Sequence, residues 1–185
     1  MIVQTEYTPN PDTLKFLPGK KVSEAGPLEF TKKDKNVKIP LVNKILSLEG
    51  TVMVFFGEDF ITVKKEKSLN WEDLKHGIIS EINDYYSKGN EIVVKKNLGE
   101  SVEHAKIESS NEVIDKINEI LDTRIRPAVA RDGGDIKFKS FKDWVVTVEL
   151  KGSCSGCPSS VMTLKQGVQN LLCHYIPEVK SVEAS

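Results

Sequence analysis

Residues 132–158 read DGGDIKFKSFKDWVVTVELKGSCSGCP, and this stretch decides how the second half of the chain is built. Residues 136–141 and 144–150 are rich in β-branched and aromatic side chains, and only Lys142 and Asp143 separate them. This pattern predicts two strands joined by a tight turn. The glycines of residues 132–135 predict a turn that ends a preceding helix. The two cysteines then follow the second strand directly.

The segments on either side of this hairpin have helical periodicity. Residues 109–112 read SSNE, a capping box, and apolar Ile114, Ile117, Leu121 and Ile125 follow at helical spacing. Pro127 is expected to kink or restart this helix. Residues 159–175 form an amphipathic helix, and residues 178–183 alternate like a last strand. The expected order is α-β-β-α-β, a compact two-layer unit.

The first half of the chain alternates strand and helix patterns. Its expected strands cover residues 2–7, 14–17, 51–56 and 60–64, and its expected helices cover residues 40–48 and 70–88. Polar residues 89–108 read as a linker, in which residues 92–94 could form a short strand or a docked segment. We therefore expect an α/β (α+β) protein of two small domains, residues 1–88 and 109–185, joined by residues 89–108.

The composition excludes several classes of protein. Hydrophobic residues make up 39% and charged residues 29%, which suits a globular chain. Lys and Arg number 26 against 27 Asp and Glu, so no general affinity for nucleic acid follows. No apolar run approaches the roughly 18 residues of a membrane-spanning helix. The N-terminus lacks signal-peptide features, so we expect a bacterial cytoplasmic protein, or an organelle-matrix protein in its mature form.

The cysteine count points to chemistry in a reducing compartment. Three cysteines, Cys154, Cys157 and Cys173, are too few and odd in number for a secreted disulfide framework. Cys154 and Cys157 form a C-x-x-C pair at a strand-to-helix turn. The positive end of the following helix favours thiolates there, and Pro158 suits the first helical position.

Three functions fit such a pair. Thiol–disulfide exchange is one, although a thioredoxin-like motif belongs early in a βαβ unit. A structural zinc is another, but it needs four ligands, and this chain has no second pair at matching spacing. The third is an iron–sulfur cluster, for which Cys154 and Cys157 from each of two chains supply four thiolates around a two-fold axis. A short, open loop suits a protein that passes the cluster on.

The chain resembles the Nfu/NifU-like iron–sulfur cluster scaffold family. Residues 126–127 (RP), 132–135 (DGGD) and 152–159 (GSCSGCPS) resemble the NifU C-terminal domain, and residues 3–16 (VQTEYTPNPDTLKF) resemble the Nfu N-terminal domain. The resemblance implies a [4Fe–4S] cluster that bridges a homodimer through Cys154 and Cys157. It further implies a cluster donor and apo iron–sulfur acceptor proteins as partners.

The remaining candidate residues have structural interpretations. Asp132 and Asp135 could suggest an acid/base pair, but the glycines between them favour a turn. Cys173 is expected to be a solvent-side or partly covered thiol, and His76, His104 and His174 are not expected to bind metal. Since no nucleophile–base arrangement appears, we expect no enzymatic activity. The balanced charge and the lack of a long apolar run lead us to expect no nucleic-acid partner and no membrane.

Overall fold

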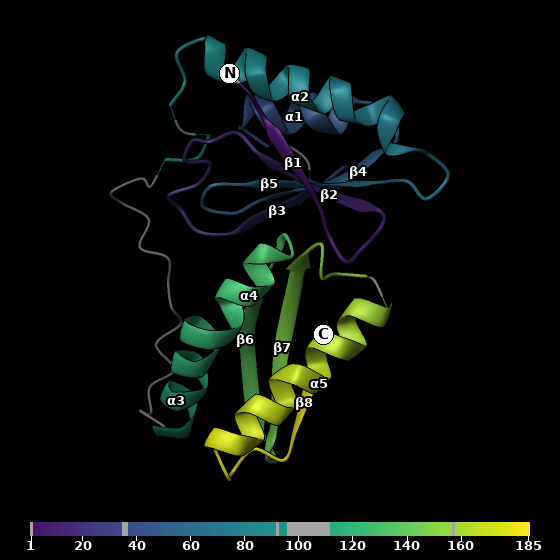
Figure 1. The fold of residues 1–185 in the computed structure, drawn as a ribbon. Helices are drawn as coiled ribbons and strands as arrows, with labels where there is room; N and C mark the ends of the chain where they lie inside the picture. The colour runs from purple at the N-terminus through teal and green to yellow at the C-terminus, as the bar shows by residue number, and fades with distance from the viewer. Residues whose placement is uncertain (1, 35–36, 92, 96–111, 157) are drawn as a thin grey trace. The chain divides into compact units, whose positions relative to one another are not determined.

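The computed structural model describes residues 2–34, 37–91, 93–95, 112–156 and 158–185 (Figure 1). For residues 158–160 it describes the backbone. The chain divides into two compact units, Met1–Val102 and Glu103–Ser185, and each unit has its own hydrophobic core. Helices and sheets are mixed in both units, as predicted from the sequence.

The first unit is built on a five-stranded antiparallel sheet with the order β1-β2-β5-β4-β3. The four strands predicted from the sequence are present, and a further strand, β3, lies at the sheet edge beside β4. Leu28-Glu29-Phe30-Thr31 alternates apolar and polar residues, but the run is only four residues long and all of its residues are half-buried, so it is a weak strand signal. The strands are β1 (Gln4–Tyr7), β2 (Thr13–Leu17), β3 (Leu28–Thr31), β4 (Thr51–Phe56) and β5 (Ile61–Lys65).

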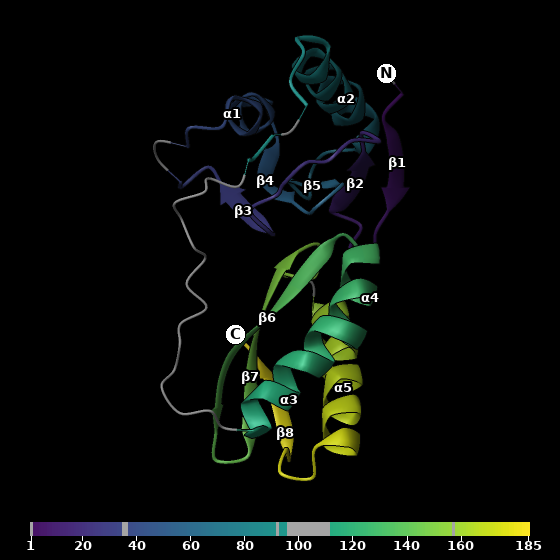
Figure 2. The same cartoon turned by 90° about the vertical axis from the view of Figure 1, so that its left-hand side faces the viewer.

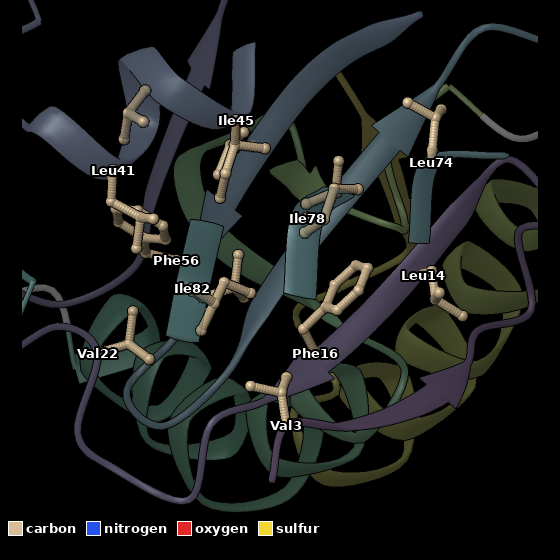
Figure 3. Close-up of a cluster of buried hydrophobic side chains, with 14 of the residues drawn as sticks. Val3, Leu14, Phe16, Val22, Leu41, Ile45, Phe56, Leu74, Ile78 and Ile82 are labelled. Atoms are coloured by element: carbon tan, nitrogen blue, oxygen red, sulfur yellow. The ribbon is translucent and has the colours of Figure 1, made fainter. Parts of the chain in front are cut away.

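Two helices, α1 (Pro40–Ser47) and α2 (Trp71–Ser87), cover one face of this sheet. Figure 3 shows Ile78 and Ile82 of α2 pointing toward Phe16 and Phe56 of the strands, and all four side chains are fully buried. Leu74, Ile78 and Ile82 stand at helical spacing on α2, and this face of the helix builds the core. Burial of such side chains is the main source of stability for a two-layer unit.

Residues 93 and 94, which follow α2, pack against the first unit. The backbone amides of Val93 and Val94 both donate to the carbonyl of Val22, at 3.1 and 3.0 Å, and the amide of Glu24 donates to the carbonyl of Val94 at 2.9 Å. Ser23 and Val94 form a parallel bridge. Residues 93–94 are thus a docked segment, the second of the two alternatives that the sequence left open.

The second unit has the predicted order α-β-β-α-β (Figure 2). Its sheet has the order β6-β7-β8, in which β6 and β7 are antiparallel and β8 is parallel to β7. Buried residues of the helices and strands share one core. The elements are α3 (Glu112–Ile120), η1 (Leu121–Ile125), α4 (Arg126–Arg131), β6 (Gly134–Lys142), β7 (Val145–Gly152), α5 (Pro158–Tyr175) and β8 (Ser181–Ala184).

The helix restarts next to Pro127, one of the two outcomes expected from the sequence. The α-helix α3 passes into one π-helical segment, η1, before α4 begins at Arg126 with Pro127 in its first turn. Proline has no N–H to donate, so a helix that continues past it must change its hydrogen-bond pattern. The helix continues in this way to Arg131, where the turn at Asp132 and Gly133 leads into β6.

Candidate metal centre

The cysteine loop, residues 152–156, begins where β7 ends and leads toward α5. Gly152 is the last residue of β7 and pairs with Gly134, the first residue of β6. The loop therefore lies beside the turn that connects α4 to β6. Gly133, Gly152 and Gly156 have φ angles of 80°, 69° and 73°, a region that glycine enters without steric cost. These glycines let the turn and the loop bend back on themselves.

Hydrogen bonds hold the loop against the turn. The Ser153 amide donates to the carbonyl of Gly133 at 3.2 Å, and the Ser153 hydroxyl donates to the carbonyl of Asp132. Within the loop, the amide and hydroxyl of Ser155 both donate to the carbonyl of Gly152, at 3.2 and 2.9 Å. The DGGD turn and the cysteine loop are therefore one joined structure.

Cys154 lies inside this joined structure. Only 5% of its surface is exposed, and it belongs to the core of the second unit. Its sulfur lies 3.8 Å from the Ser153 hydroxyl. A Cβ atom added to Gly134 would lie 2.8 Å from the Cys154 sulfur, so the thiol occupies the space that Gly134 leaves. The sequence predicts an open loop, whereas Cys154 is covered and the exposed part of the loop is at Gly156.

Cys157, the second predicted ligand, lies outside the described residues, as does His104. Cys173 is half-buried on α5, as predicted, and His76 and His174 are exposed. Among the residues that the structure describes, no three His, Cys, Asp or Glu side chains come together to hold a metal ion. The assignment of Cys154 and Cys157 as metal ligands therefore stays a prediction.

The two aspartates of the DGGD turn have different environments. Asp132 is exposed, whereas Asp135 is buried at the start of β6, where its carboxylate lies 3.2 Å from Nε of Arg126. Burial raises the pKa of Asp135, and the nearby Arg126 guanidinium offsets part of that rise. Arg126 also contacts Asp122 at 2.7 Å and donates from Nε to the carbonyl of Ile136 at 3.2 Å. Asp135 therefore braces α4 against β6 and does not form an acid/base pair with Asp132.

The sequence contains a signal for the contact between the DGGD turn and the cysteine loop, but none for the ion pair between Arg126 and Asp135. An antiparallel hairpin pairs residues at equal distances from its turn, and Gly134 and Gly152 stand nearly symmetrically about Asp143 and Trp144. Equal distances from the hairpin turn therefore predict that the DGGD turn lies beside the cysteine loop. The Arg126–Asp135 ion pair had no comparable signal, because nothing in spacing alone shows which charged side chains become buried together.

Comparison with known protein families accounts for most of the chain. Residues 117–183 match the NifU-like domain, and residues 3–89 match the family described as scaffold protein Nfu/NifU N terminal. The NifU-like match contains the second sheet except for Ala184, and the other match contains the first sheet. The cysteine loop and the DGGD turn both fall within the NifU-like match.

Similar proteins include the human NFU1 iron–sulfur cluster scaffold homolog, mitochondrial, which is 46% identical over 185 residues, covering 99% of this chain and 71% of the human protein. NifU-like protein 4, mitochondrial, of Arabidopsis thaliana is 43% identical, covering 99% of this chain and 65% of that protein. A solution structure of a NifU-like protein from Saccharomyces cerevisiae has 25% identity and a TM-score of 0.48, covering 52% of this chain and 87% of its own. The chain belongs to the Nfu/NifU-like iron–sulfur cluster scaffold family.

Proposed function

We propose that this protein is an iron–sulfur cluster scaffold or carrier that holds a [4Fe–4S] cluster between two copies of the chain and passes it to apo-proteins. Cys154 and Cys157 of each copy are the proposed ligands. The observation that carries the proposal is the placement of Cys154 in a glycine-bounded loop that leads toward an 18-residue helix, within a domain whose relatives are named as cluster scaffolds.

The number of sulfur donors supports the bridging arrangement. A [4Fe–4S] cluster is commonly held by four thiolates, and one C-x-x-C pair supplies two. Cys173 lies near the far end of α5, 15 positions after Pro158, or roughly 22 Å along the helix at 1.5 Å per residue, and so cannot complete the set at the loop. Two copies related by a two-fold axis provide the missing pair.

Transfer follows from thiol exchange. The cluster is cargo, and thiolates of an acceptor protein replace those of Cys154 and Cys157 one at a time. The proposed ligands follow β7 in the sequence, so their release need not break the strand pairing of the sheet. No enzymatic step is needed, which is why we propose a carrier and not a catalyst.

We further propose that the two domains, residues 1–88 and 109–185, have separate tasks and that residues 89–108 connect them. The NifU-like domain holds the cluster, and the first domain modulates partner choice or stability. The partners are a cluster donor, apo iron–sulfur acceptors and a second copy of the chain, with no nucleic acid and no membrane. In the described residues, no helix is long and apolar enough to cross a membrane. The relatives' mitochondrial names favour the organelle matrix over the bacterial cytoplasm.

Anaerobic reconstitution with iron and sulfide tests the ligand assignment. We expect the wild-type chain and a Cys173→Ser variant to bind the same amount of iron, because Cys173 has no part in the site. Cys154→Ser and Cys157→Ser should each abolish stable binding. A full cluster in either of the last two variants would refute the assignment. Insulin reduction without metal, or zinc alone in protein purified without oxygen, would support the redox or structural-zinc alternative.

A further inference from the structure

Ser153 connects the cysteine loop to the DGGD turn through both its backbone and its side chain. Its amide donates to Gly133 and its hydroxyl donates to the carbonyl of Asp132. Only 1% of Ser153 is exposed, so these hydrogen bonds are shielded from water. A buried polar group that loses its partner is costly, and the loop is therefore strongly held at the position next to Cys154.

Gly134 also lies next to Cys154. An added Cβ atom would lie 2.8 Å from the Cys154 sulfur and 3.3 Å from its Cβ, distances at which a neighbour must move. It would also lie 2.6 Å from the backbone carbonyl oxygen of Lys151, which cannot turn away as a side chain can. The Cys154 side chain can lie where it does because residue 134 has no side chain.

We propose that Ser153 and Gly134 are positioning residues of the cysteine site, which together hold the Cys154 thiol in a covered place beside the DGGD turn. This inference rests on the proposed function in taking Cys154 as a ligand. An iron ion needs room next to the sulfur, and Cys154 is 5% exposed. The loop must therefore move away from Asp132 when Cys154 binds iron, and the Ser153 hydrogen bonds set how readily that movement occurs.

Thiol alkylation of the full-length, metal-free protein measures this directly. Iodoacetamide is added, and the modification of each cysteine is followed by peptide mass spectrometry. Each rate is divided by the rate for the same cysteine in denaturant, which removes intrinsic differences in reactivity. We expect wild-type Cys154 to be more strongly protected than half-buried Cys173. Ser153→Ala should increase the Cys154 rate about tenfold, as expected for an opening equilibrium that loses one buried hydrogen bond, and leave Cys173 unchanged.

Ser155→Ala is the matched control. Like Ser153, Ser155 lies in the loop after β7, and its hydroxyl donates to a backbone carbonyl. That carbonyl belongs to Gly152 of the same loop and not to the DGGD turn. We expect Cys154 in this variant to react within about twofold of the wild-type rate, because the hydrogen bonds to the turn remain. Equal acceleration in both variants, or wild-type protection in Ser153→Ala, would overturn the proposal.

Loss of folding in Ser153→Ala would show as lost circular dichroism and as faster alkylation of both Cys154 and Cys173. In that case a folded Gly134→Ala variant replaces it, because the added Cβ atom would displace the Cys154 sulfur and leave the Ser153 hydroxyl in place. Faster alkylation of Cys154 with Cys173 unchanged is the expected result, and wild-type protection of Cys154 in that variant would overturn the proposal. These measurements need no cluster, so they are independent of the proposed function. Full cluster binding by Cys154→Ser would refute the ligand assignment and leave the alkylation result as it is.

Discussion

Gly134 and Cys154 are 20 positions apart in the sequence, yet a Cβ atom on Gly134 would lie 2.8 Å from the Cys154 sulfur. The β6–β7 hairpin creates this contact, because it pairs Gly134 with Gly152, two residues before the cysteine. The first strand of the hairpin thus shapes the site that follows its second strand. Gly134 belongs to the predicted turn, and its missing side chain also leaves room for the Cys154 thiol.

The first prediction concerns this space. Gly134→Ala should lower the free energy of unfolding by about 1–3 kcal/mol, because the new methyl group overpacks against Cys154 and the Lys151 carbonyl. Urea denaturation measures the change. Gly167→Ala is the control: Gly167 lies in α5 with open space around its Cα, and alanine there should stabilise the helix by about 0.5–1 kcal/mol. The same sign of change in both variants would contradict the packing at Gly134.

A second prediction concerns the turn at the other end of the hairpin. Asp143 and Trp144 have φ angles of 51° and 65°, which cost a residue other than glycine about 1–2 kcal/mol each. Trp144 is half-exposed, and its carbonyl accepts from the Lys180 amide at 2.8 Å whatever its side chain. Trp144→Gly should therefore be more stable than Trp144→Ala by about 1 kcal/mol in urea denaturation, since both lose the ring but only glycine is unstrained. Equal stability would show that the turn is not strained.

The third prediction is a pH dependence in the first unit. Nζ of Lys44 and Nζ of Lys88 each lie 2.8 Å from Oδ2 of Asp84, and these hydrogen bonds, that of Lys44 first, lower the pKa of Asp84 to about 2. A lowered native pKa stabilises the fold above the unfolded pKa of about 3.9, and that stabilisation is lost as the pH falls toward 2. Lys44→Met should raise the pKa of Asp84 toward its usual value, as measured by carboxyl NMR titration. A normal pKa in the wild-type protein would contradict the contact.

The fourth prediction tests the proposed domains. A fragment of residues 109–185 contains the whole core of the second unit, so it should fold alone and bind a cluster as the full chain does. Ile117 is fully buried in that core, and Ile117→Ala should lower the stability of the fragment by about 2–5 kcal/mol. Exposed Lys116→Ala, one residue earlier, should change it by no more than about 0.5 kcal/mol. An unfolded wild-type fragment would show that the two units depend on each other.

Periodicity predicted most of the secondary structure, because the buried faces are regular. Helix α2 has Leu74, Ile78 and Ile82 at helical spacing, and all three are buried in the core. Strand β7 alternates half-buried and buried residues along its whole length. Strand β3 was not predicted, because its alternating run of residues 28–31 is only four residues long and its place depends on pairing with β4. Long regular faces are visible in a sequence, and the pairing of a short edge strand is not.

The candidate site was only partly predictable for a similar reason. The C-x-x-C spacing and its place between a strand and a helix are local, and both could be read from residues 144–175. The cover over Cys154 depends on Gly134 and on the hydrogen bond from Ser153 to Asp132, which join segments about 20 residues apart. Such contacts depend on strand register and side-chain packing. A sequence therefore shows that a thiol pair is present but not how accessible each thiol is.

The number of chains around one cluster is the most direct test of the account. The protein is reconstituted anaerobically with iron and sulfide, and its mass is measured under native, oxygen-free conditions together with its iron and sulfide content. The account predicts one species of two chains with about four iron and four sulfide ions, as a cluster with four thiolate ligands requires. A single chain carrying a complete cluster, with no added thiol bound to it, would contradict the account.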